Sequence, residues 1–153
     1  MHSERIITQY GNKVRVRTCG VLIRNSKILL LNHNGINDEN IFWSFPGGGV
    51  NFGESLEKCL IRECEEECNI SIEVKNFIYL DEYINKNFHA IELLYLVSSN
   101  DTPSLGKDPE LENSFHGIKW FSLDEIIQVS ECQKHSFLSK NIHLIDNLMQ
   151  KCN

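Results

Sequence analysis

The segment 55–68, SLEKCLIRECEEEC, constrains the fold most, because its pattern predicts an amphipathic helix with a defined inward face. Apolar side chains at Leu56, Leu60 and Cys64 recur at the four-residue spacing of a single helix face. Ser55 is a suitable N-cap, since its hydroxyl can accept a hydrogen bond from a free backbone N–H of the first turn. A helix is therefore expected here, with this apolar stripe packed against a core.

Acidic residues also fall on the inward side of this predicted helix. At about 100° per residue, Glu63 and Glu67 lie on or beside the apolar stripe. Glu66 lies further round the helix, and Glu65 points outward. The crowded carboxylates repel one another and oppose the helix dipole, at a total cost of roughly 1–3 kcal/mol that Arg62 relieves in part. A bound divalent cation would reverse the sign of this cost, and clustered oxygen ligands suit Mg²⁺ or Mn²⁺ better than Zn²⁺; the alternative is a solvated acidic face.

Cysteines within the same segment raise the alternative of a thiol or zinc site. Cys64 and Cys68 are four residues apart and could hold a metal ion from one helix. The sequence has no CxxC pair and no convincing His pair nearby, so ordinary half-buried thiols are the preferred interpretation. The six cysteines stand at positions 19, 59, 64, 68, 132 and 152.

The remaining periodicity predicts a mixed β-sheet with helices on its faces, in a single domain that covers residues 1–153. Residues 1–12 are expected to form a flexible or edge segment. Asn25 and Ser26 predict the turn of a β-hairpin, and Pro46 with the three following glycines is expected to end a short strand. Strands are expected at 13–23, 27–31, 42–45, 77–83, 89–98 and 117–121, and helices at 55–68, from the capping box at 122–125, and around 142–149.

The overall charge and the absence of long apolar runs narrow the function. A formal net charge of −6 argues against a general nucleic-acid or anionic-membrane surface, because both partners need a basic patch. The start of the sequence lacks the apolar region of a signal peptide, and no run approaches the ~20 apolar residues of a membrane span. A cytoplasmic protein with reduced cysteines is therefore expected. Small polyanionic substrates remain compatible with this charge if a metal ion supplies positive charge locally.

A glycine run precedes the predicted helix at a specific distance. Gly48 is followed after five residues by Glu54, and Glu54 after seven by Arg62. With the acids that follow, this spacing resembles the signature of the Nudix family, G-x5-E-x7-R-E-U-x-E-E-x-G-U, where U is a bulky aliphatic residue. The residues that match are Gly48, Glu54, Arg62, Glu63, Glu66, Glu67 and Ile70.

Two positions depart from that signature. Cys64 stands in place of an aliphatic residue, which is a mild change because cysteine packs as a small hydrophobe. Asn69 stands in place of a glycine that follows the helix, and Asn is the usual second choice where a left-handed residue is needed. The resemblance extends over most of residues 13–150, through the leading hairpin and the segment 118–125.

The resemblance implies an α/β fold, namely an α/β/α sandwich around a mixed β-sheet, and the activity of a pyrophosphohydrolase. Nudix enzymes hydrolyse nucleoside diphosphates linked to another group X, by attack of water on phosphorus and without a covalent enzyme intermediate. By position, Glu63, Glu66 and Glu67 would be the ligands of Mg²⁺, with Mn²⁺ as a substitute. The Gly47 carbonyl would add another ligand, and Arg62 would orient the glutamates through charge-assisted hydrogen bonds.

Other roles stay open at the level of sequence. The general base is either a glutamate of the signature or a carboxylate on a downstream loop, where Glu112 is the candidate and a solvated loop acid the alternative. The candidates for substrate binding are Gly47, Gly48, Arg15, Arg17 and Tyr83. ADP-ribose, dinucleoside polyphosphates, nucleotide sugars and nucleoside triphosphates are all candidate substrates. A non-catalytic nucleotide-binding module is the alternative function, and a homodimer is left open.

Overall fold

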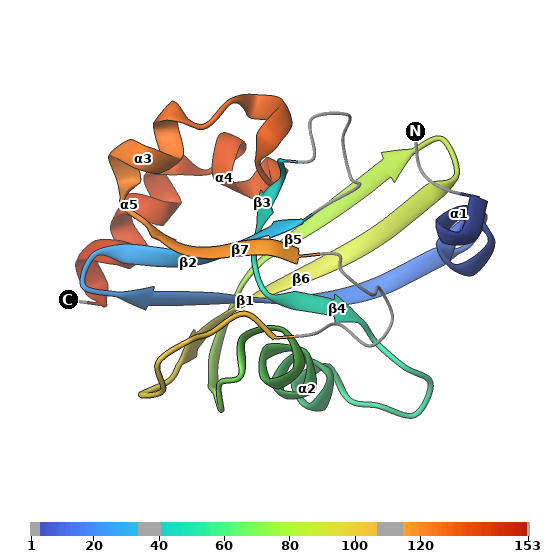
Figure 1. The fold of residues 1–153 in the computed structure, drawn as a ribbon, viewed down its shortest axis with the longest axis horizontal. Helices are drawn as coiled ribbons and strands as arrows, with labels where there is room; N and C mark the ends of the chain where they lie inside the picture. The colour runs from blue at the N-terminus through green and yellow to red at the C-terminus, as the bar shows by residue number, and fades with distance from the viewer. Residues whose placement is uncertain (1–3, 34–40, 107–114, 153) are drawn as a thin grey trace.

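The computed structural model describes residues 4–33, 41–106 and 115–152, which form a mixed β-sheet between two helical layers (Figure 1). Helix α2 (Leu56–Cys68) covers one face of the sheet, and three helices of the C-terminal third cover the other. The expected α/β sandwich around a mixed sheet is thus confirmed. The other helices are α1 (Glu4–Tyr10), α3 (Leu123–Gln128), the 3₁₀ turn η1 (Glu131–Gln133), α4 (Ser136–Lys140) and α5 (Ile142–Lys151).

Among the described residues, seven strands form the sheet, and they fall into two groups. The strands are β1 (Val14–Arg24), β2 (Lys27–His33), β3 (Trp43–Ser44), β4 (Gly47–Gly49), β5 (Glu73–Asn85), β6 (Phe88–Ser98) and β7 (Phe115–Phe121). One group, called the main sheet below, has the order β4-β1-β6-β5, with β1 and β6 parallel. In the other group, β2 pairs with β3 and β7. The predicted hairpin is present, but β1 and β2 pair only next to their turn, at Ile23–Ile28 and Arg24–Lys27. Beyond these pairs the two strands separate, and each joins its own group.

Local geometry confirms one expected turn, corrects the segment at the start of the chain and adds one strand that was not expected. Asn25 and Ser26 both have positive φ, as the tight turn of a β-hairpin requires. Residues 4–10 form helix α1, where a flexible or edge segment was expected. The short strand expected at 42–45 does end before Pro46, as β3. The glycines at 47–49 then form a further strand that was not expected, β4, because they pair antiparallel with residues 17–19 of β1.

Strand β1 separates two apolar cores. Its alternate side chains point to opposite faces, so Cys19 packs near Phe137 of α4, while Leu22 packs near Leu60 of α2. The first core also contains residues of α3 and α5, and the second contains Cys64 and Cys68 of α2. Each helical layer is therefore attached to the sheet by its own core. No described helix has the length and apolar character needed to cross a bilayer.

Candidate active site

Helix α2 begins and turns as its sequence predicts. The Ser55 hydroxyl accepts from the Lys58 N–H at 3.2 Å, which satisfies one free donor of the first turn. Glu63 is 6% exposed and Glu67 only 2%, so both carboxylates lie on the inward face. Glu65 is exposed, as the helical geometry required. Two acids are therefore held away from bulk water, where a cationic partner has its largest effect.

Arg62 connects the acids of the helix to the segment that precedes it. Its guanidinium forms a two-pronged contact with Glu54, with Nε–Oε1 at 2.7 Å and Nη2–Oε2 at 3.0 Å. Its Nη1 donates to Glu63 at 2.8 Å and to Glu66 at 3.2 Å. Hydrogen bonds from Arg62 lower the pKa of the Glu54 carboxyl to about 2. The arginine thus orients two helix acids, while Glu54 joins the loop to the helix.

Strand β4 approaches the helix through its glycine backbone. The Gly47 N–H donates to Glu67 Oε2 at 2.8 Å. A Cβ at Gly48 would lie 2.3 Å from Glu63 Oε1, which is closer than any side chain can tolerate. The Cys59 thiol points at the same strand and donates to the Gly49 carbonyl at 3.5 Å. The absence of side chains at β4 therefore lets the carboxylates of α2 reach the edge of the main sheet.

The chemistry of these donors fits a divalent cation. Glu63, Glu66 and Glu67 supply hard carboxylate oxygens at one end of α2, and two of the three are buried. Within the described ranges, no group of three His, Cys, Asp or Glu side chains is arranged as a ready cage. The reason is visible in the contacts, since Glu63 and Glu66 turn toward Arg62 and Glu67 turns toward Gly47. The three carboxylates are thus suitable ligands for a divalent cation, and the Arg62 guanidinium competes with that cation for Glu63 and Glu66.

Comparisons with known proteins identify the family. The model of the NUDIX domain matches residues 14–143. The chain belongs to the Nudix family. It is 26% identical over 141 residues to the nucleoside triphosphatase NudI of Enterobacter sp. (strain 638), an alignment that covers 84% of this chain and 97% of that protein. It is 33% identical over 67 residues to the RNA pyrophosphohydrolase of Erythrobacter litoralis, covering 42% of this chain and 41% of that protein.

Solved Nudix structures share the fold. The MutT NUDIX hydrolase from Burkholderia pseudomallei is 25% identical, with a TM-score of 0.69 over 85% of this chain and 99% of its own. A NUDIX hydrolase from Nitrosomonas europaea is 20% identical, with a TM-score of 0.70 over 89% of this chain and 90% of its own. The chain is accordingly a Nudix hydrolase of the pyrophosphohydrolase class. Enzymes of this family act on small nucleotides and generally use divalent metal ions.

The glycine position of the Nudix signature is filled by Asn69, which adopts the left-handed conformation with φ 53° and ψ 39°. Its side-chain Nδ2 donates to the hydroxyl of Ser104 at 3.0 Å and to the Ser104 carbonyl at 3.3 Å. Two backbone donors of the same segment, Ser104 and Gly106, bond to the carbonyls of Cys68 and Glu67. A glycine could not make the side-chain contacts. The departure from the signature therefore ties the end of the Nudix helix to the chain after β6.

The three side chains proposed to bind substrate lie on one face of the main sheet. The pairing of β1 with β6 and of β6 with β5 places Arg15 and Tyr83 in one row across Ala90, and Arg17 in the next row beside Glu92. This face, called the polar face below, is opposite to the face that α2 covers. Arg15 also stacks over the Tyr10 ring of α1, with 4.1 Å between the guanidinium carbon and the ring centroid.

Arg17 faces a buried carboxylate that the sequence did not single out. Burial alone would lower the pKa of Arg17, but the negative charges of Glu92, Glu67 and Glu63 raise it above its usual range. The Arg17 Nε is buried and has no hydrogen-bond partner in the described part of the chain. Arg17 therefore lies under the electrostatic influence of both the Nudix acids and Glu92.

Glu92 is held ionised by its surroundings. Burial would raise the pKa of its carboxyl, but Arg17 and His135 hold that pKa well below the usual range. The Nε2 of His135 lies 3.3 Å from Glu92 Oε2, and the Cys19 thiol donates to the same oxygen at 3.4 Å. His135 Nδ1 accepts from the Phe137 N–H, so Nε2 carries the proton donated to Glu92. Nothing in the spacing of His135 predicts this contact, because it depends on the loop between α3 and α4.

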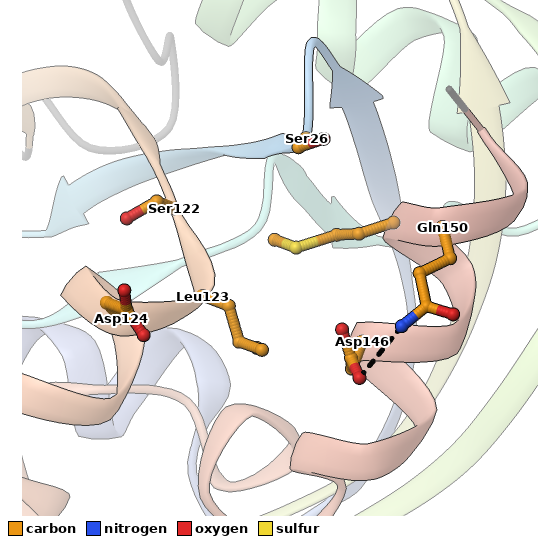
Figure 2. A pocket seen from close by; sticks show the side chains of 7 residues that line it. Ser26, Ser122, Leu123, Asp124, Asp146 and Gln150 are labelled. Carbon is orange, nitrogen blue, oxygen red and sulfur yellow. Dashed lines mark hydrogen bonds between the residues drawn. The ribbon is translucent and has the colours of Figure 1, made fainter.

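The thiols of the Nudix helix belong to the packing. Cys59, Cys64 and Cys68 are buried free thiols, more buried than expected, and burial raises their pKa, to about 11 for Cys59. Glu112, the candidate base on the downstream loop, lies outside the described residues. A separate hollow lies between the β1–β2 turn, α3 and α5 (Figure 2). Gln150 donates to Asp146 one turn earlier on α5, at the edge of the hollow, and none of the predicted site residues lines it.

Proposed function

We propose that this Nudix hydrolase cleaves the pyrophosphate linkage of a nucleoside diphosphate derivative in a Mg²⁺-dependent reaction, with Mn²⁺ as a substitute, by attack of water on phosphorus. The observation that carries the proposal is the arrangement of Glu63 and Glu67, two buried carboxylates beside a glycine strand. Arg62 bonds the first, and the Gly47 N–H bonds the second. An acidic site does not attract a polyphosphate without a cation. The donor set is the kind that a hard divalent ion prefers.

Nucleoside triphosphates are the substrate class we propose to test first. The named activity of the NudI relative, which aligns with most of this chain, supports this choice. A nucleoside triphosphate is a nucleoside diphosphate whose group X is phosphate, so it falls within the broader proposal. Nucleotide sugars, ADP-ribose and dinucleoside polyphosphates are the remaining classes.

In this proposal Glu63, Glu66 and Glu67 hold the metal ion, the Gly47 carbonyl adds a ligand, and Arg62 orients the acids. When bound, the cation supplies the positive charge that neutralises the pyrophosphate and lowers the pKa of water. The absence of side chains at Gly47 and Gly48 lets the backbone of β4 lie directly against Thr18 of β1 and the Glu63 carboxylate of α2.

We assign the nucleotide itself to the polar face. Arg17 can donate to a phosphate because its Nε is unsatisfied among the described residues, and Arg15 is the second cation of that face. Tyr83 is 40% exposed in the same row as Arg15 and offers a ring for stacking. Glu92 and His135 keep the charge environment of Arg17 fixed.

The general base has two candidates. One is a glutamate of the Nudix signature, and the other is Glu112. A parallel measurement of Glu112→Gln and Glu66→Gln separates them, because loss of the base lowers kcat while leaving Mg²⁺ binding intact, whereas loss of a metal ligand weakens both.

A substrate screen tests the proposal. Nucleoside triphosphates, nucleotide sugars, ADP-ribose and dinucleoside polyphosphates are incubated with the protein and Mg²⁺ or Mn²⁺, and the products are identified by mass spectrometry. Reactions in ¹⁸O-labelled water are expected to place the label on a phosphate product. The isosteric Glu67→Gln protein serves as the blank. Mg²⁺-dependent nucleotide binding without product from any class would favour the non-catalytic binding module instead.

Metal binding has its own readout. Mg²⁺ that binds the folded protein raises its melting temperature by mass action, and the shift should be lost in Glu67→Gln. We also propose a cytoplasmic location, in which the six free thiols stay reduced.

A further inference from the structure

Helix α2 covers only part of its face of the main sheet. Strand pairing aligns β1, β6 and β5 in three rows on this side of the sheet: Val14–His89–Ile84, Val16–Ile91–Glu82 and Thr18–Leu93–Leu80. The third row meets α2 on β1, where Thr18 bonds Cys59, and the other two lie farther along the strands. The aliphatic side chains of these rows point to the same side as Gly20, where a Cβ would contact Leu60 and Cys64 of α2. We call Val14, Val16, Leu80, Ile84, Ile91 and Leu93 the apolar face.

The apolar face is exposed to solvent in the single chain. Val14, Val16, Leu80 and Ile84 are between 41% and 65% exposed, and Phe77, in the next row toward the helix, is 54% exposed. Figure 1 shows α2 under the other end of these strands, with α1 beside the start of β1. Together these side chains offer on the order of 500 Å² of contiguous apolar surface, which is large for a monomer.

Charged groups within the rows are few and mutually satisfied. Glu82 and His89 lie on this side of the sheet, and His89 Nε2 is 2.9 Å from Glu82 Oε1. Their pairing means that covering the rows does not leave an isolated carboxylate in an apolar contact. The face is also built from branched aliphatic side chains, which interdigitate when two sheets pack face to face.

We infer that the apolar face binds a second copy of this chain, so that two main sheets pack face to face about a two-fold axis. A stable interface needs roughly 800 Å² from each partner, of which about 65% is apolar in homodimers. The apolar face supplies nearly that apolar share, and a two-fold axis makes the same surface its own partner. The polar face lies on the opposite side of the main sheet and stays outside the interface. The inference does not depend on the proposed reaction.

Analytical ultracentrifugation of the full chain tests it, from about 1 to about 200 µM. The expected result is a species of twice the 17.7 kDa monomer mass. Ile84→Glu and Leu80→Glu should each raise the dimer dissociation constant at least about tenfold, because each introduces an unpaired charge into both halves of the contact. Val16→Lys tests the same face from β1.

Ile127→Glu is the matched control, since Ile127 is 56% exposed on α3, on the opposite side of the sheet. It should leave the dissociation constant unchanged. Melting temperatures verify that each variant is folded, and turnover should be unaffected in all of them. A monomer across the whole concentration range would overturn the inference. So would a dimer that Ile84→Glu, Leu80→Glu and Val16→Lys leave intact, since it would use another surface or another partner.

Discussion

The two faces of the main sheet beyond α2 differ in chemistry although the same three strands build both. One face carries arginine, glutamate, aspartate and tyrosine side chains, and the other carries mainly valine, isoleucine and leucine, with the paired Glu82 and His89 among them. Residues 14–17 show the pattern in miniature, because Val-Arg-Val-Arg sends alternate side chains to opposite faces. A half-covered sheet therefore offers two working surfaces, one beside the acids of α2 for a charged ligand and one for apolar contact.

The largest expected effect is a loss of activity when a proposed metal ligand of α2 is changed. Glu66→Gln should lower kcat/KM at least about a hundredfold, because it removes a proposed metal ligand while keeping the shape of the side chain. Glu65→Gln is the matched control, since Glu65 is exposed on the outward side of the same turn and should keep normal activity. Steady-state kinetics at saturating Mg²⁺ measure both. If the two variants were equally active, Glu66 would not be a metal ligand.

Two neighbouring residues of β1 test whether the polar face is the one that binds substrate. Arg17→Gln should raise KM at least about tenfold with a smaller change in kcat, because a charge-assisted contact to the substrate is lost. Val16→Gln places the same side chain one residue away on the opposite face and should leave KM unchanged. If both variants raise KM equally, the polar face is not the substrate face.

A smaller effect on stability is expected at the end of the Nudix helix. Asn69→Ala should lower the free energy of unfolding by roughly 1–2 kcal/mol, because alanine is strained at positive φ and cannot bond Ser104. Asn69→Gly also loses the contacts with Ser104 but is not strained at positive φ, so it should lower the free energy of unfolding by less than Asn69→Ala does. Urea unfolding monitored by circular dichroism measures the difference. An alanine variant as stable as the wild type would contradict the role of this cap.

The smallest expected effect is a pH dependence that Glu54 adds to stability. Its carboxyl has a pKa of about 2 in the folded protein against 4.5 ordinarily, so folding favours the ionised form. This contribution is complete above pH 4.5 and is lost as the pH falls from 4.5 to 2. Glu54→Gln should therefore flatten the decline of the melting temperature over that interval. Glu57→Gln, which removes an exposed acid from the same helix, is the control.

Local features of the site could be predicted from the sequence because they depend only on residues a few positions apart. The inward direction of Glu63 and Glu67 follows from helical geometry, and the bond from Arg62 to Glu66 follows from their four-residue spacing on the helix. The N-cap at Ser55 and the capping box at Ser122 are equally local. These elements need no knowledge of the rest of the fold.

Features that depend on distant pairing could not be predicted in the same way. The alternation at Arg15 and Arg17 indicates two faces, but not which one α2 covers. Glu92 reaches Arg17 only through the parallel pairing of β1 with β6, and His135 through a loop far along the chain. The glycines of β4 look like a turn until β1 is placed beside them. Sequence thus predicts the acidic helix better than the surface that would hold the nucleotide.

The parallel pairing of β1 with β6 also orders events during folding. Val14 pairs with His89, so closing this part of the sheet joins positions about seventy-five residues apart, and such long loops form late. The Nudix acids lie on a helix that forms from neighbouring residues. On the ribosome, the residues of α2 are synthesised before those of β6, so the row that joins Arg17 to Glu92 does not yet exist when the acids emerge. The acids are thus present in a nascent chain before the surface that would select the nucleotide.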